Sequence, residues 1–84
     1  MTAIKRKTAT MTMVMAEALG EIGYSEAVPT LIKLLKSGKT ELIVSAARAL
    51  GKIGDPAAVT PLMMILPSRN YDIQDSAARA LEKI

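Results

Sequence analysis

Hydrophobic residues recur with a helical period along most of the chain, and no segment shows the alternation expected of a strand. The clearest segment lies near the middle, where apolar positions are three and four residues apart: Ile43, Ala46, Ala47, Leu50 and Ile53. Similar patterns elsewhere predict five helices, over about residues 8–22, 26–37, 41–53, 56–66 and 72–84.

The second and fourth of these helices each have an apolar face that we expect to be buried. In the second helix the face consists of Val28, Leu31, Ile32 and Leu35. In the fourth helix it consists of Val59, Leu62, Met63 and Leu66. The spacing of three and four residues places each set on one side of its helix.

The chain repeats itself with a period of 31 residues. Residues 16–37 align with residues 47–68, and half of the aligned residues are identical. A second step of 31 aligns Ser-Ala-Ala-Arg-Ala-Leu at 45–50 with an identical hexapeptide at 76–81. Helix pairs that repeat at such a period complete their core against neighbouring pairs. We therefore predict an all-α superhelix, or solenoid, of two and a half repeats.

Residues 1–84 form one domain, because so short a chain leaves no room for a second. The expected divisions are a basic segment at 1–7, a first repeat at 8–38, a second at 39–69 and half of a third at 70–84.

Glycines after the predicted helices indicate where those helices end. Gly23, Gly38 and Gly54 are expected to stop the first three helices in the C′ position. Gly20 and Gly51 form a Gly-x-x-Gly spacing with two of them and are interpreted as stops as well.

Polar residues before the predicted helices indicate the N-caps. Asp55, followed by Pro56, is expected to cap the fourth helix, and Ser25 the second. Asp72 and Asp75 are interpreted as a shortened capping box at the start of the fifth helix.

Composition excludes several classes of function. The chain has no Cys and no His, so thiolate sites, the usual zinc ligands and the commonest general base are absent from the sequence. We expect no catalytic residues, no cofactor and no metal. The longest apolar run, residues 62–66, is far below the roughly 20 residues of a membrane-spanning helix. Absence of Cys fits a reducing compartment, and we expect a cytoplasmic protein.

Residues 46–62, Ala-Ala-Arg-Ala-Leu-Gly-Lys-Ile-Gly-Asp-Pro-Ala-Ala-Val-Thr-Pro-Leu, resemble the short HEAT repeat of the phycobilisome-lyase type. The resemblance extends over about residues 9–84 and implies a HEAT/armadillo-like fold. It is poor evidence for function, because such repeats occur in scaffolds, chromophore-lyase subunits, nucleic-acid enzymes and a metal-dependent hydroxylase. The hydroxylase uses His-Glu pairs, which this chain lacks.

The resemblance also implies that the second helix of each repeat lines the binding face. The outward positions of these helices are mixed, with lysines at one end and apolar residues at the other. These candidate protein-binding residues are Thr30, Lys33, Lys36, Ala57, Thr60 and Met64. On the first helices, the period aligns Glu17 with Arg48 and Glu21 with Lys52, which predicts two surface ion pairs.

The sequence therefore predicts a non-catalytic module that binds another protein or acts as a scaffold. One alternative is an auxiliary subunit of an enzyme complex, similar to a bilin lyase. The other is a weak nucleic-acid binder, against which the scattered acids and the lack of stacking aromatics count. That binder would use the lysine-rich surface formed by Lys5, Arg6, Lys7, Lys33, Lys36 and Lys39.

The last predicted helix lacks the partner helix that completes the earlier repeats. Leu81 and Ile84 are expected to contribute to an uncovered apolar flank there. Two explanations are open: the chain is a piece of a longer protein, or copies of it associate through this flank. We expect association into a homo-oligomer.

Overall fold

The computed structural model describes the backbone of residues 2–84 and the side chains of residues 10–84. Within this part of the chain, five α-helices and two short 3-10 turns follow one another without any strand, which confirms the predicted all-α repeat fold. The elements are α1 (Thr2–Ile22), η1 (Ser25–Ala27), α2 (Val28–Leu35), α3 (Thr40–Ile53), η2 (Pro56–Ala58), α4 (Val59–Ile65) and α5 (Tyr71–Lys83).

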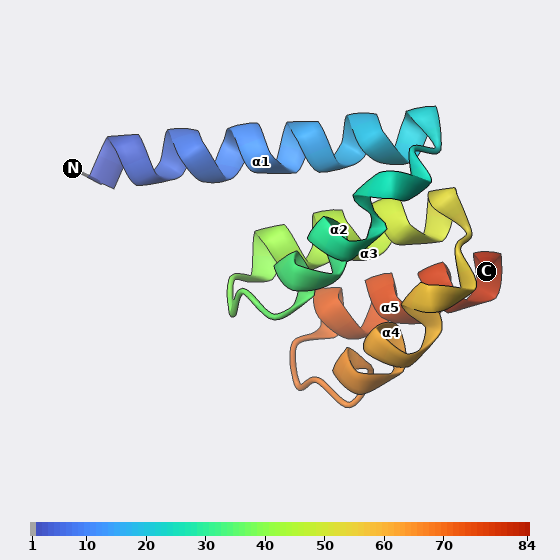
Figure 1. Cartoon of the computed structure of the whole chain (residues 1–84). Helices are drawn as coiled ribbons and strands as arrows, with labels where there is room; N and C mark the ends of the chain where they lie inside the picture. Colours follow the sequence, from blue (N-terminus) through green and yellow to red (C-terminus); the bar gives the residue numbers. More distant parts are fainter. Residues whose placement is uncertain (1) are drawn as a thin grey trace.

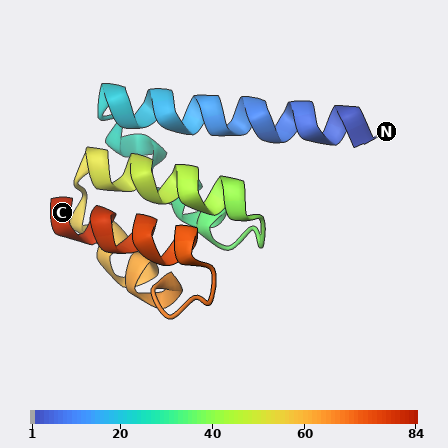
Figure 2. The ribbon, with the colours of Figure 1, turned by 180° about the vertical axis from the view of Figure 1, so that it is seen from behind.

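The helices form two layers (Figures 1 and 2). The first helices of successive repeats, α1, α3 and α5, lie side by side in one layer, which we call the first-helix layer. In the other layer α2 packs mainly against α3, and α4 against α5. Each helix pair thus shares its core with the next pair, as expected of a solenoid.

Helix α1 is longer than the sequence pattern indicated, since it begins at Thr2 instead of residue 8. Residues 2–9 contain no proline or glycine, so nothing in the sequence interrupts the helix there. With 21 residues against 14 in α3, α1 is about 10 Å longer and extends beyond the start of α3 (Figure 1). The side chains of the basic cluster Lys5, Arg6 and Lys7 lie outside the described residues.

The core lies between the two layers and is built around Leu31, Leu50 and Leu62, the largest fully buried side chains. The predicted inward face of α3 is confirmed, with only Ile53 partly exposed. The prediction for Met63 is wrong, because its side chain is 57% exposed. Met63 follows Leu62 by about 100° around the helix, which turns it away from the core.

Gly23, Gly38 and Gly54 have φ angles of 75°, 76° and 76°. The predicted helix stop is confirmed at Gly23 and Gly54, which directly follow the last residues of α1 and α3. At Gly38 it is wrong, because α2 ends at Leu35 and Gly38 lies in the loop three residues later. The same prediction is wrong for Gly20 and Gly51, which lie inside α1 and α3 and are buried. A glycine inside a helix has another use, which is to let a second helix approach closely.

The predicted cap at Asp55 is confirmed, because its Oδ1 accepts a hydrogen bond from the backbone N–H of Ala57 at 2.9 Å. The prediction for Ser25 is wrong. Tyr24 occupies the N-cap position of η1, and no side chain caps that turn. Ser25 itself is the first residue of the turn, so its hydroxyl is past the capping position.

The capping box predicted from Asp72 and Asp75 is also wrong, because Asn70 is the N-cap of α5. Its Oδ1 accepts from the N–H of Asp72 at 2.9 Å and of Ile73 at 3.4 Å. Helix α5 begins one residue earlier than expected, which moves Asp72 from the cap into the first turn.

Candidate protein-binding surfaces

The outward side of α2 and α4 presents all six residues predicted to bind another protein. Thr30 and Lys33 lie on α2, Lys36 at its C-terminal end, Ala57 in η2, and Thr60 and Met64 on α4; each is exposed. Because α2 and α4 are neighbours in one layer, the structure brings the six residues to one side of the molecule. We call this side the second-helix face.

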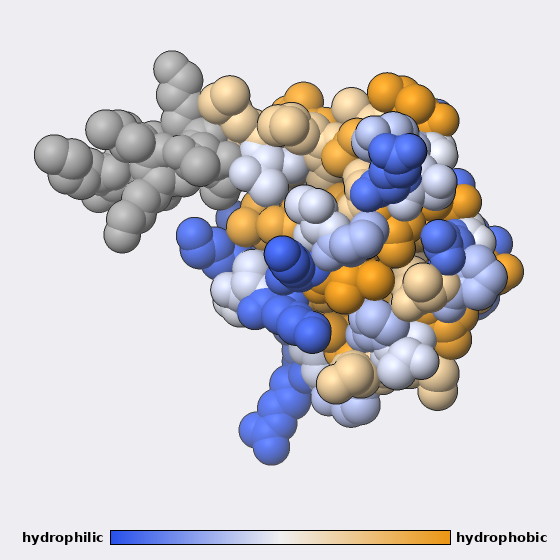
Figure 3. Space-filling model, viewed as in Figure 1, coloured by the Kyte–Doolittle hydropathy of each residue, from blue (hydrophilic) through white to orange (hydrophobic). Residues whose placement is uncertain are grey.

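The second-helix face combines positive charge with flexible apolar side chains. Met64 is 71% exposed and its neighbour Met63 57%. Neither Lys33 nor Lys36 has an ion-pair partner among the described side chains. Figure 3 views this side and shows hydrophobic residues through its middle with hydrophilic residues on both its left and its right. Unbranched methionines adapt to many partner surfaces.

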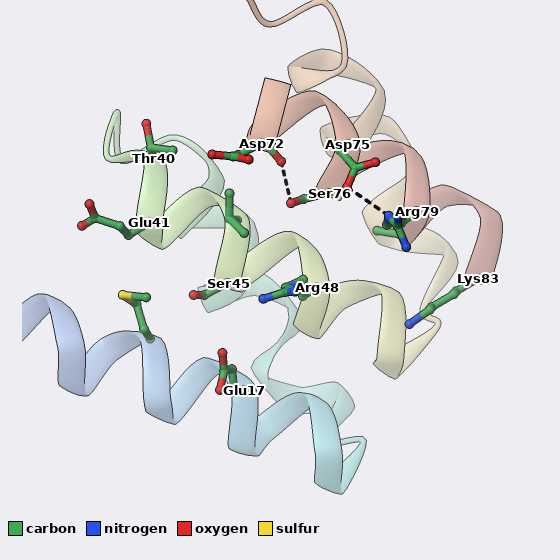
Figure 4. A pocket seen from close by; sticks show the side chains of 13 residues that line it. Glu17, Thr40, Glu41, Ser45, Arg48, Asp72, Asp75, Ser76, Arg79 and Lys83 are labelled. Atoms are coloured by element: carbon green, nitrogen blue, oxygen red, sulfur yellow. Dashed lines mark hydrogen bonds and ion pairs between the residues drawn. The ribbon is translucent and has the colours of Figure 1, made fainter. Parts of the chain in front are cut away.

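A groove of about 630 Å³ crosses the first-helix layer, on the opposite side of the molecule (Figure 4). Its two ends carry opposite charges. Glu41 and Asp72 lie near the N-terminal ends of α3 and α5, whereas Arg79 and Lys83 lie toward the C-terminal end of α5. The sequence did not predict this groove, although the 31-residue period aligns two of its charged residues, Glu17 and Arg48.

One of the two predicted ion pairs between α1 and α3 is confirmed. Lys52 Nζ donates a hydrogen bond to Glu21 Oε1. This hydrogen bond, together with the positive charge of Lys52 and a smaller contribution from Lys83, lowers the pKa of Glu21 below its ordinary value. The prediction for Glu17 and Arg48 is wrong, because both side chains border the open groove and form no ion pair.

Within the groove, two polar groups of α5 are occupied by local partners. Asp75 Oδ2 accepts from Arg79 Nε at 2.9 Å, a pair within one helix. The Ser76 hydroxyl donates to the carbonyl oxygen of Asp72 at 2.6 Å (Figure 4). The Ser76 hydroxyl is therefore used to hold the first turn of its own helix.

The two residues expected to contribute to an apolar flank at the end of the chain are only partly exposed. Leu81 and Ile84 are partly buried, and both pack against the hydrophobic core. Most of the large hydrophobic side chains that the described residues expose lie on α1 and α4 instead. Neither the prediction of association nor its assignment to Leu81 and Ile84 is tested by this finding.

Among the described residues, no helix is both long enough and apolar enough to cross a membrane.

A family model described as HEAT repeats matches residues 7–82, which is nearly the whole chain and includes parts of all five helices. No curated protein matches the chain.

Proposed function

The chain belongs to the HEAT-repeat family, and from this premise we propose that it is a non-catalytic protein-binding module. HEAT repeats generally mediate protein–protein interaction or scaffolding. The observation that carries the proposal for this chain is the second-helix face, where an exposed methionine lies on the same side as two lysines that have no ion-pair partner among residues 10–84.

The chemistry of this face indicates the kind of partner. Lys33 and Lys36 attract carboxylates, and Met64 offers apolar surface that loses contact with water on binding. The partner segment is therefore acidic, with at least one large apolar side chain that meets Met64.

We further assign the repeats to the phycobilisome-lyase type, on the resemblance of residues 46–62. That assignment supports the alternative in which the module is an auxiliary subunit and its partner supplies the chemistry. The two versions of the proposal differ only in whether the bound partner is an enzyme.

The experiment starts with the immobilised chain and a lysate of its source, from which retained proteins are identified by mass spectrometry and the strongest one is purified. Calorimetry then measures its affinity for wild type, for Lys33→Glu combined with Lys36→Glu, and for Met64→Glu. Because charge reversal and loss of apolar contact both act at the face, we expect each variant to bind at least about tenfold more weakly.

The matched control is Lys83→Glu, which reverses a charge in the groove on the opposite layer. It should bind the partner as tightly as wild type does. Loss of binding in this control, with binding retained in the α2 and α4 variants, would move the site to the groove. If wild type retains no protein above the level of bare beads, the proposed function is wrong.

A further inference from the structure

Helix α1 carries an exposed apolar stripe on the side that faces away from α3. Its residues follow the helical spacing of three and four: Met11, Val14, Met15, Ala18 and Ile22. All five are exposed, and four of them are large hydrophobic residues with exposures of 58%, 60%, 62% and 75%. We call this set the α1 stripe.

The equivalent face of the next first helix is buried, because another helix packs against it. One period later, four of the corresponding residues of α3 are buried, at 8%, 3%, 0% and 1% exposure: Leu42, Ser45, Ala46 and Ala49. They lie on the side of α3 that packs against α1, as the close contact of Ala49 with Gly20 shows. The α1 stripe is therefore the repeat's helix-packing face, left without a helix against it.

The corresponding residues of α5 repeat this arrangement. Ile73, Ser76, Ala77 and Ala80 are buried, and Ala80 lies against Gly51 of α3. Two copies of the same face are thus covered within the molecule, and only the copy on α1 is open.

The outer side of α5, at the opposite edge of the first-helix layer, is not complementary to the α1 stripe. On α3, the residues that face α5 include Val44 and Gly51, and one period later these positions hold Asp75 and Glu82. A Cβ on Gly51 would lie 2.9 Å from the Cα of Ala80, so a glutamate at this position prevents a helix from packing as closely. The α5 flank of one copy therefore cannot cover the α1 stripe of another in the way that α1 covers α3.

We propose that the α1 stripe is covered by the α1 stripe of a second copy, related by a two-fold axis and antiparallel. In the register that this symmetry favours, Met11 meets Ile22 of the other copy, and Met15 meets Ala18. The small Ala18 leaves room for the long Met15, so the stripe is complementary to itself. The proposed contact buries the face that α3 and α5 also bury, but it pairs two like faces of antiparallel helices, whereas within the molecule this face packs against the glycine-bearing side of a parallel helix.

The first turns of α1 extend about 10 Å beyond α3, as measured by the difference between 21 and 14 residues. In the antiparallel register this extension projects past Ile22, the last residue of α1 in the other copy, so the contact is confined to residues 11–22. The two first-helix layers then join into one continuous layer of six helices.

Sedimentation equilibrium tests the association. Wild type should dimerise at micromolar concentrations, and Met15→Glu should weaken dimerisation by at least about tenfold, because it buries a charge in the contact. Met64→Glu is the matched control, since it makes the same replacement at an exposed methionine of α4. It should dimerise like wild type, and both variants should keep the circular-dichroism spectrum of wild type.

Cysteine pairing tests the register, because the chain has no cysteine of its own. Met11→Cys and Ile22→Cys variants are mixed in a glutathione buffer, and covalent dimers are counted by mass spectrometry. The mixture should form the mixed disulfide, whereas each variant alone should remain almost unlinked. Like residues lie about 16 Å apart in this register, beyond the Cα separation of about 7 Å that a disulfide allows.

Three results would overturn the proposal. Wild type that stays monomeric at high micromolar concentration would leave the stripe to a helix of another protein. Dimerisation of Met15→Glu with wild-type affinity would place the contact elsewhere. Efficient linkage of Met11→Cys to itself would show that the helices do not pair in this register. None of these results depends on the second-helix face, so the proposed function is tested separately.

Discussion

Gly20 of α1 lies so close to Ala49 of α3 that a Cβ built on the glycine would be 2.8 Å from the Cα of the alanine. Gly51 and Ala80 repeat the relationship between α3 and α5, at 2.9 Å. Side chains at these glycines would have to push two backbones apart. The row of glycines therefore sets the separation of the helices in the first-helix layer.

Gly20→Ala is expected to destabilise the protein. At an exposed helical position the change would stabilise by up to about 1 kcal/mol, because alanine has the higher helix propensity. Here overpacking against Ala49 is expected to cost about 1 to 3 kcal/mol and to reverse the sign. Urea unfolding measures the difference, and Gly51→Ala should behave in the same way. Greater stability of either variant would show that the helices can separate at little cost.

Leu50→Ala is expected to cost about 2 to 5 kcal/mol of unfolding free energy, since Leu50 is fully buried at the centre of the core. Thermal and urea unfolding of the variant measure the loss. Lys39→Ala, at an exposed position, is the control. If the two variants unfold at similar midpoints, the assignment of the core is wrong.

Asn70 has two roles that different substitutions separate. Its Oδ1 caps α5, and its Nδ2 donates to Thr40 Oγ1 at 3.1 Å, which ties the start of α5 to the start of α3. Asn70→Ala removes both interactions and should cost about 0.5 to 2 kcal/mol from the cap alone. Asn70→Asp keeps a capping oxygen and loses only the donor, so it should be the more stable variant in urea unfolding. The opposite order would show that the tie to Thr40 outweighs the cap.

The pKa of Glu21 is expected to rise toward its ordinary value of 4.5 in Lys52→Ala, because the hydrogen bond and the nearest positive charge are lost together. Carboxyl chemical shifts in an NMR titration follow the change. Since the folded-state pKa is lowered, the pair stabilises the fold above the unfolded-state pKa. That contribution disappears as the pH falls through the folded-state pKa.

Lys83→Ala is the matched control for this titration, because Lys83 acts on Glu21 only through its charge and contributes less. It should raise the pKa of Glu21 by less than Lys52→Ala does, and added salt should reduce both effects. An equal rise in the two variants would mean that the hydrogen bond to Lys52 is absent in solution.

Nucleic-acid binding, if present, is expected to be no tighter than micromolar and to weaken steeply with salt. The net charge is only +3, and the chain has two tyrosines but no other aromatic residue for stacking. Fluorescence anisotropy with a labelled duplex and a labelled single strand, each at several salt concentrations, measures this. Sequence-selective binding that persists at physiological salt would favour a nucleic-acid function over a protein partner.

The sequence predicted the order of the helices because the 31-residue period and the helical spacing agree, as in Leu50 and its neighbours on α3. It misassigned Gly20 and Gly51 because a glycine needed for positive φ and a glycine needed for close approach look the same in sequence. A usable signal existed: each follows an alanine of the buried face by four residues, Ala16 and Ala47. Small residues four positions apart on one helix face indicate where a second helix packs closely.

The site was harder to predict than the fold. The six residues of the second-helix face are exposed as expected, because outward positions follow from helical geometry. The exposed apolar stripe of α1 was not predicted, because the sequence alone does not show which neighbour each face of a helix packs against. Glu82, which stands one period after Gly51, was the available clue that the outer side of α5 differs from that of α3. It becomes informative only once Gly51 is known to touch Ala80.

Asp75 and Glu82 have a consequence for how assemblies of this fold can grow. With valine and glycine at these two positions, as in the preceding repeat, the α5 flank would match the surface that α3 offers to α5. The α1 stripe of another molecule would fit such a flank, and every addition would expose a fresh flank. Contacts of this kind extend into filaments. Asp75 and Glu82 therefore disfavour a close contact of this kind between copies of the chain.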